Sequence, residues 1–397
     1  MKKTLAALAV LGAFAGSAAA ADVTLYGVVD QALSYTYSDV KNFNGAKSVD
    51  GESTLEMASG INAGSRFGIK GVEDLGNGYK VGFKLENAVN TDDGTLGQDG
   101  RLFGREAALT VYGPFGELAF GRMGGIASAA GTYELIGYVD AFDGGDNAVW
   151  GFASSSRCDN MVTYASPRLA GLQLVAQYSF KTDGTSDEGV EGRSTAERYA
   201  SVGLSGEYGP AQFAAGYELT KYSTLDRQAT KDLDDGQLVF VGGNYDFGVA
   251  KLFAEAQYFT GAKNASAYSL DGFNKDLGKT TPTVRSQKGF EGYGLHLGAI
   301  APVGEGELTV GTYYVSASLK DPYEGTTKYD DVDTDYLGLA ARYTYPLSQR
   351  TTVYVGGGYA YATMDAPKTA AGAAVTGYTN DNKTKVGNVY LGLTHTF

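Results

Sequence analysis

The chain has 397 residues and a formal net charge of −13, with 57 Gly, 29 Tyr and 18 Phe but only one Trp and 8 Pro. Such an acidic chain is a poor partner for nucleic acid, and its single cysteine cannot form an internal disulfide. The richness in glycine and aromatic strand formers favours β-structure over helix. No Pro/Ser-rich linker divides the sequence, so we expect one continuous architecture.

The first 21 residues have the layout of a secretory signal peptide. Lys2 and Lys3 form a basic start, residues 5–14 an apolar middle, and residues 17–21 a small-residue stretch with cleavage after Ala20 or Ala21. Loss of the two lysines takes the net charge from −13 to −15 in a mature chain of 397 − 21 = 376 residues. The rest of the sequence contains no run of about 18 apolar residues, so it predicts no membrane-spanning helix. An exported chain without such a helix belongs in the periplasm, the outer membrane or the medium.

Segments of alternating apolar and polar residues recur along the rest of the chain, as expected for strands with two different faces. Most of them reach the roughly 9 to 11 residues that a tilted strand needs to cross hydrocarbon. We predict sixteen strands, at residues 23–37, 65–73, 79–88, 104–112, 116–122, 160–165, 172–180, 198–208, 212–222, 237–246, 251–260, 293–301, 307–319, 334–345, 351–363 and 385–397.

The connections between these strands alternate in length. Tight turns fall at residues 74–78, 113–115, 166–171, 209–211, 247–250, 302–306 and 346–350. Long polar loops fall at residues 38–64, 89–103, 123–159, 181–197, 223–236, 261–292, 320–333 and 364–384. This alternation predicts an all-β fold in which residues 22–397 form a 16-stranded antiparallel transmembrane β-barrel, with both chain ends on the short-turn side.

Strand parity assigns side chains to the interior of the predicted barrel. Phe67 and Ile69 share one face of their strand, so Arg66 and Lys70 share the other. The next strand places Lys84 on the same face by the same argument. A cation facing lipid near the membrane midplane costs roughly 2 to 4 kcal/mol, so we assign these cations to a water-filled lumen.

The connection at residues 123–159 is the longest and differs in composition from the others. Residues 124–156 contain no basic residue and four acidic ones, Glu134, Asp140, Asp143 and Asp146. Because the loop also carries many apolar residues, we expect it to fold into the barrel, with Phe142 and Trp150 buried against the wall. Its acids would then face the basic wall residues across a constriction, which would set up a transverse field. The basic residues expected there are Arg66, Lys84, Arg122 and Arg157.

Several segments in a fixed order carry a family resemblance. They are residues 22–27 (DVTLYG), 65–76 (SRFGIKGVEDLG), 115–122 (FGELAFGR), 157–167 and the aromatic end at Phe397. Together they span the mature chain, which resembles the trimeric general porins of Gram-negative outer membranes, nearest to the neisserial and betaproteobacterial branch.

The resemblance implies an inward-folded loop after Arg122, pore-lining arginines at Arg66 and Arg122, homotrimers, and recognition of Phe397 by the outer-membrane assembly machinery. Outer-membrane lipid and lipopolysaccharide would surround such a barrel. Strict alternation would turn Arg122 toward lipid, so we expect a bulge near Gly121 or an early strand end. Lys84 is a weaker substitute for arginine, which leaves an anion preference open.

We therefore predict an outer-membrane porin for passive diffusion of small hydrophilic solutes and ions, without cofactor or metal. A solute-specific channel, for example for sugars, is the first alternative, because Tyr133, Tyr138 and Trp150 could form an aromatic slide. A structural or adhesive barrel is the second. No nucleophile accompanies His296 or His395, so enzymatic activity is not predicted. Each lumen cation could also be a plain solvated residue, and the loop aspartates could be turn residues.

Overall fold

The structure is a computed structural model that describes residues 21–152, 156–225, 232–277, 284–375 and 378–397. The predicted signal peptide falls almost wholly in residues 1–20 and so lies outside the described residues. Within the described part, no helix has the length and hydrophobicity needed to cross a membrane.

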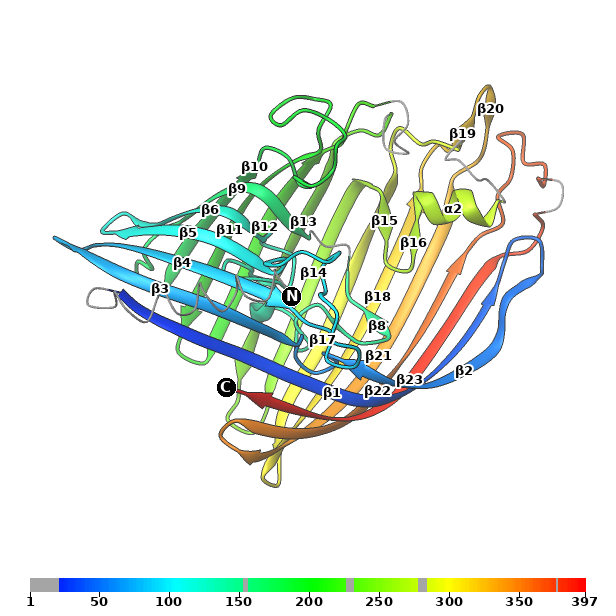
Figure 1. Ribbon diagram of the computed structural model, residues 1–397. Coiled ribbons are helices and arrows are strands. Elements are labelled where there is room, and N and C mark those ends of the chain that lie inside the picture. The colour runs from blue at the N-terminus through cyan, green and yellow to red at the C-terminus, as the bar shows by residue number, and fades with distance from the viewer. Residues whose placement is uncertain (1–20, 153–155, 226–231, 278–283, 376–377) are drawn as a thin grey trace, which may run out of the picture.

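One antiparallel sheet closes on itself to form a barrel (Figure 1). Along one edge β1 pairs with β23, and along the other it pairs first with β3 and then with β2. The 17 strands of the sheet therefore occupy 17 − 1 = 16 positions, which confirms the predicted 16-stranded barrel. The strands are β1 (Ala21–Lys41), β2 (Lys47–Ser59), β3 (Arg66–Gly76), β4 (Tyr79–Ala88), β5 (Glu106–Gly113), β6 (Gly116–Gly124), β9 (Arg157–Ala165), β10 (Leu172–Ser179), β11 (Arg198–Tyr208), β12 (Ala211–Lys221), β13 (Gly236–Asp246), β14 (Lys251–Ala262), β17 (Phe290–Val303), β18 (Gly306–Leu319), β21 (Val332–Ser348), β22 (Thr351–Met364) and β23 (Asn382–Thr396).

Shorter elements lie in the long loops. The loop after β6 holds the 3-10 helix η1 (Ile136–Tyr138) and the paired strands β7 (Gly145–Asp146) and β8 (Val149–Trp150). The loop after β14 holds β15 (Asn264–Ala265), β16 (Tyr268–Ser269) and α2 (Leu270–Asp276), and the loop after β18 holds β19 (Tyr323–Glu324) and β20 (Thr327–Lys328). The loops after β14 and β18 gather at one end of the barrel, whereas the tight turns and the C-terminus lie toward the other end (Figure 1).

The predicted long loop at residues 38–64 is wrong, because β1 continues to Lys41 and residues 47–59 form β2. Leu55 and Met57 lie opposite Tyr35 and Leu33, so they extend the outward apolar stripe of β1. Gly51 and Ser53 stand at outward positions of the same strand, and these small residues hide the alternation in the sequence. Within the described residues β2 pairs only with β1, so its other edge is open.

Buried polar contacts tie the first and last strands together where the barrel closes. The Asp30 side chain is fully buried on the inner face, and its carboxylate accepts hydrogen bonds from the hydroxyls of Tyr354, at 2.7 Å, and Thr394. At the strand end the backbone N–H groups of Gly27 and Phe397 each donate to the other's carbonyl at 3.0 Å. Closure leaves no open edge along this seam, as a strand wall in hydrocarbon requires.

A bulge interrupts β6 at Gly121, where one was expected. The register between β6 and β9 shifts between Gly121 and Met123, and Gly121 has φ +133°. Met123, which strict alternation from Gly121 also places inside, is fully buried. A side chain at Gly121 would collide with the carbonyl oxygen of Ala107 in the neighbouring strand. The chain therefore needs glycine here to redirect Arg122.

We expect Gly121→Ala to lower the free energy of unfolding by about 1 to 3 kcal/mol or more, because a side chain at positive φ adds strain to the collision with Ala107. Urea unfolding of the refolded barrel, followed by tryptophan fluorescence, would measure the change. Gly387→Ala is the matched control, since a side chain there meets its nearest atom at an ordinary 3.6 Å. Equal losses in the two variants would contradict the bulge argument.

Candidate functional site

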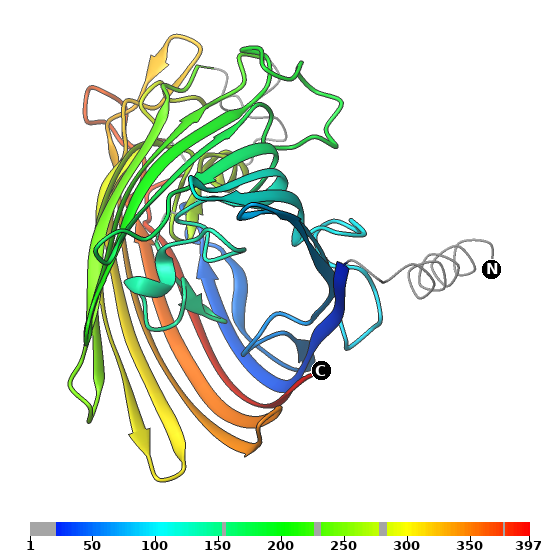
Figure 2. The same cartoon turned by 90° about the vertical axis from the view of Figure 1, so that its left-hand side faces the viewer.

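The loop between β6 and β9 lies inside the ring of strands, as predicted (Figure 2). Wall side chains hold its backbone at several points. The Tyr199 hydroxyl accepts from the Ile126 N–H at 3.3 Å, and the Asn244 amide donates to the Tyr138 carbonyl at 2.8 Å. These contacts satisfy backbone groups that the loop would otherwise expose to water, and they fix it against β11 to β13.

Inward-facing glycines make room for this loop along the wall. Leu135 Cδ1 lies 2.5 Å from the position that a Cβ at Gly203 would take, and Val149 lies as close as 2.6 Å to that of Gly338. The loop's apolar side chains are buried on these glycines, and each such burial contributes roughly 1.5 to 3 kcal/mol. The glycines whose added side chain would meet the loop include Gly203, Gly242, Gly298, Gly311, Gly338 and Gly358.

Asp140 does not face the lumen as expected, because it anchors the loop to the wall. It is 4% exposed, and its carboxylate accepts hydrogen bonds from the Tyr313 hydroxyl and the Phe142 N–H, both at 2.7 Å. The His296 ring lies beside it, with Nε2 3.5 Å from the carboxylate.

Asp146 forms a second anchor and also departs from the expected lumen position. It is 2% exposed, and its carboxylate is 3.2 Å from the Arg342 guanidinium and accepts from the Tyr390 hydroxyl. The guanidinium also lies over the ring of Phe142, 5.1 Å from its centroid, and Phe142 is buried as predicted. The side chain of Trp150 lies outside the described part of the structure.

Arg66, Lys84 and Arg105 are the cations of the opposite wall that come together in one cavity. Register places Arg66 and Lys84 on the inner face together with Tyr26, in agreement with strand parity. Arg105 was missed, because parity in a strand from residue 104 turns it outward. The observed β5 begins only at Glu106, so Arg105 leaves the alternation and reaches Glu86. The sequence contains no signal that this strand starts at residue 106 rather than at residue 104.

These cations differ in how far they are neutralised. Arg105 Nε is 2.7 Å from a Glu86 carboxylate oxygen, and Lys84 Nζ is 2.8 Å from one of Glu106. Arg66 instead donates to the backbone carbonyl of Gly64 at 3.1 Å, and it forms no ion pair with any residue that the structure describes.

A cavity of about 530 Å³ brings the two sides together. Arg66, Lys84 and Arg105 line it from the wall, and Glu134 and Asp143 line it from the loop. Only two of the four predicted loop acids, and two of the four predicted wall cations, thus meet at this constriction. The terminal Phe397 lies at its edge.

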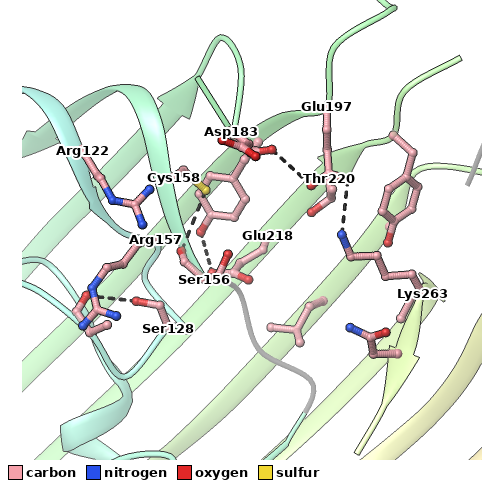
Figure 3. A pocket seen from close by; sticks show the side chains of 18 of the residues that line it. Arg122, Ser128, Ser156, Arg157, Cys158, Asp183, Glu197, Glu218, Thr220 and Lys263 are labelled. Atoms are coloured by element: carbon pink, nitrogen blue, oxygen red, sulfur yellow. Dashed lines mark hydrogen bonds and ion pairs between the residues drawn. The ribbon is translucent and has the colours of Figure 1, made fainter. Parts of the chain in front are cut away.

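Arg122 and Arg157 line a neighbouring cavity instead (Figure 3). Arg122 is bound by Asp159, with 2.6 Å between nitrogen and oxygen, and Arg101 binds the same carboxylate at 2.7 Å. Cys158 is buried at the base of the loop. The bulge at Gly121 therefore turns Arg122 toward Asp159 rather than toward the constriction.

The two loop acids of the constriction hold protons unusually tightly. Burial, together with the nearby Asp143 carboxylate, raises the pKa of Glu134 to about 7. Burial and the charge of Asp140 raise the pKa of Asp143 as well. Near neutral pH the Glu134 carboxyl is therefore partly protonated, which lowers the negative charge on the loop side of the cavity.

Comparisons with known proteins agree with this architecture. A family model described as Gram-negative porin matches residues 6–366. An outer membrane porin protein of Bordetella pertussis is 34% identical over 400 residues, covering 94% of this chain and 99% of the relative. Outer membrane porin protein 32 of Delftia acidovorans is 29% identical over 363 residues, covering 89% and 88%. The solved anion-selective porin from Comamonas acidovorans matches with a TM-score of 0.61 at 24% identity, covering 95% of this chain and all (100%) of that chain.

Ion preference across this lumen should depend on pH near neutrality. As pH falls through about 7, Glu134 becomes protonated and the constriction loses negative charge, so the reversal potential in a KCl gradient should move toward that of chloride. Glu134→Gln should hold the potential at its low-pH value across the same window. A pH response that persists unchanged in this variant would contradict the assignment.

The close packing of the loop on the inward-facing glycines predicts that a larger side chain there will loosen the loop. Gly203→Val should displace the Leu135 side chain from the wall. The loop then loses one of its packing contacts, so the single-channel current should become noisier. The double variant Gly203→Val with Leu135→Ala should restore steady current, since the smaller side chain removes the collision. Single-channel recording of both variants checks this, and equal noise in the two would sink the idea.

Proposed function

This chain belongs to the Gram-negative porin family and forms an outer-membrane channel for passive diffusion, and from that premise we propose how its residues select ions. Selection takes place in the constriction between the wall cations and the loop acids. The channel prefers small anions. The observation that carries this proposal is that Arg66, which forms no ion pair with a described residue, lines the same cavity as Glu134, whose carboxyl is partly protonated near pH 7.

Local charge decides the preference over the net charge of the chain. Two unit charges 10 Å apart in water interact by only roughly 0.4 kcal/mol, and physiological salt screens charges over about 8 Å. Carboxylates on the external loops therefore act weakly on an ion in the constriction. Within it, Glu86 is engaged by Arg105 and Glu106 by Lys84, which leaves Arg66 to act on passing ions. The similar porin of Comamonas acidovorans is described as anion-selective, which agrees with this proposal.

The assembled state that we propose is a homotrimer in contact with outer-membrane lipid and lipopolysaccharide. The open edge of β2 supports an additional partner there, as do the exposed side chains of Leu55 (70%) and Met57 (57%) on its outer face. Phe397 keeps a half-exposed side chain at the end of β23, where the assembly machinery could read it.

A sugar-type channel has less support. The Tyr133 hydroxyl donates to Glu117 at 3.0 Å and that of Tyr138 to Glu207 at 2.7 Å, so both tyrosines are engaged at the wall. An aromatic slide needs a row of ring faces that solutes can reach along the lumen, and two tyrosines bound to wall carboxylates do not supply such a row.

Replacement of Arg66 by Gln should lower the anion-to-cation permeability ratio about two- to fivefold, which corresponds to roughly 0.4 to 1 kcal/mol of lost attraction. Reversal potentials in a KCl gradient measure the ratio. Lys80→Gln removes an exposed cation from the same wall and should change the ratio much less. Arg122→Gln should also have a smaller effect, since Asp159 already neutralises Arg122. An unchanged ratio in the Arg66 variant would overturn the proposed role.

A further inference from the structure

A second cavity, of about 580 Å³, adjoins the constriction and opens among the long loops (Figure 3). It shares Ala130 with the constriction cavity, so the start of the inward loop separates the two. We propose that this cavity binds zwitterionic solutes, such as amino acids and short peptides, before they enter the constriction. The inference rests on the proposed role of the barrel as a diffusion channel.

Arg157 supplies the cationic end of the site. Its Nε is buried without a hydrogen-bond partner in the described structure, and its guanidinium makes a single long contact of 3.5 Å to the Gln98 amide oxygen. The neighbouring Arg101 and Arg122 are already held by Asp159. The terminal guanidinium nitrogens of Arg157, which line the cavity and make only this long contact within the described residues, are therefore the donors that a solute carboxylate can use.

The other end of the cavity is arranged for a cation. A Glu197 carboxylate oxygen lies 3.4 Å from the Lys263 ammonium, which also lies 5.9 Å from the ring centroid of Tyr222. A carboxylate together with an aromatic face is a favourable setting for an ammonium group. The Lys263 side chain is 47% exposed, so it can move aside and leave that position to a solute. The buried carboxylate of Glu218 also lines the cavity, where it accepts hydrogen bonds from the Tyr199 hydroxyl and the Ala127 N–H.

The separation of charge favours a zwitterion over a simple ion. Figure 3 shows Arg122 and Arg157 on one side of the cavity and Glu197 with Lys263 on the other. A plain anion drawn to Arg157 would meet unfavourable potential from the Glu197 and Glu218 carboxylates, whereas Asp183 is already paired with Arg101 at 2.7 Å. A solute that carries both charges can satisfy both ends. The site is open to water, so binding should be weak enough for the solute to leave again, as conduction requires.

The test is interruption of KCl current through the refolded full-length mature protein by three probes. Dialanine carries both charges, N-acetyl-dialanine only the carboxylate, and dialanine amide only the ammonium. We expect dialanine to interrupt the current at the lowest concentration. Arg157→Gln and Glu197→Gln should each raise the dialanine concentration needed by about tenfold or more, because each removes a charged hydrogen-bond partner.

Two variants serve as matched controls. Arg193→Gln and Asp187→Asn make the same charge changes at exposed positions of the loop between β10 and β11, outside the cavity lining, and should leave the block unchanged. Equal block by N-acetyl-dialanine and dialanine would overturn the zwitterion assignment. So would site variants that behave like their controls. Conductance in KCl alone is recorded for each protein, and its absence in the unmodified barrel would count against the channel itself rather than this site.

Discussion

Every backbone N–H and C=O inside hydrocarbon must find a partner within the protein, and the rest of the structure depends on this constraint. It forces the sheet to close between β1 and β23, where Asp30 binds groups from β22 and β23. Closure at sixteen positions encloses a lumen too wide for wall side chains to fill. The interior is therefore open to water, and a loop can enter it.

Docking of the inward loop then narrows the wide lumen. Glycines let the loop lie close to the wall, and the two buried aspartates bind it there through Tyr313 and Arg342. Asp140 and Asp146 are bound to wall side chains, so of the four loop acids only Glu134 and Asp143 face the wall cations. The charge balance of the constriction thus follows from which loop acids hold the loop and which line the cavity.

Regular strands are the part of this molecule that a sequence can predict. A period of two gave the strand count, and it placed Arg66 and Lys84 on the inner face because a fixed register carries each side chain with it. The same rule failed at Arg105, which lies before the start of β5, and in β2, where the small residues Gly51 and Ser53 interrupt the outward apolar stripe. Asp140 and Asp146 were misplaced because an irregular loop has no period from which a direction could be derived.

The most direct test of the account is the reversal potential of the unmodified mature protein, recorded at neutral pH in a planar bilayer under a tenfold KCl gradient. A linear conductance with a reversal potential displaced toward that of chloride is the predicted result, since an open lumen would then be governed by Arg66 and its neighbours. A folded barrel without conductance, or a reversal potential displaced toward that of potassium, would contradict it.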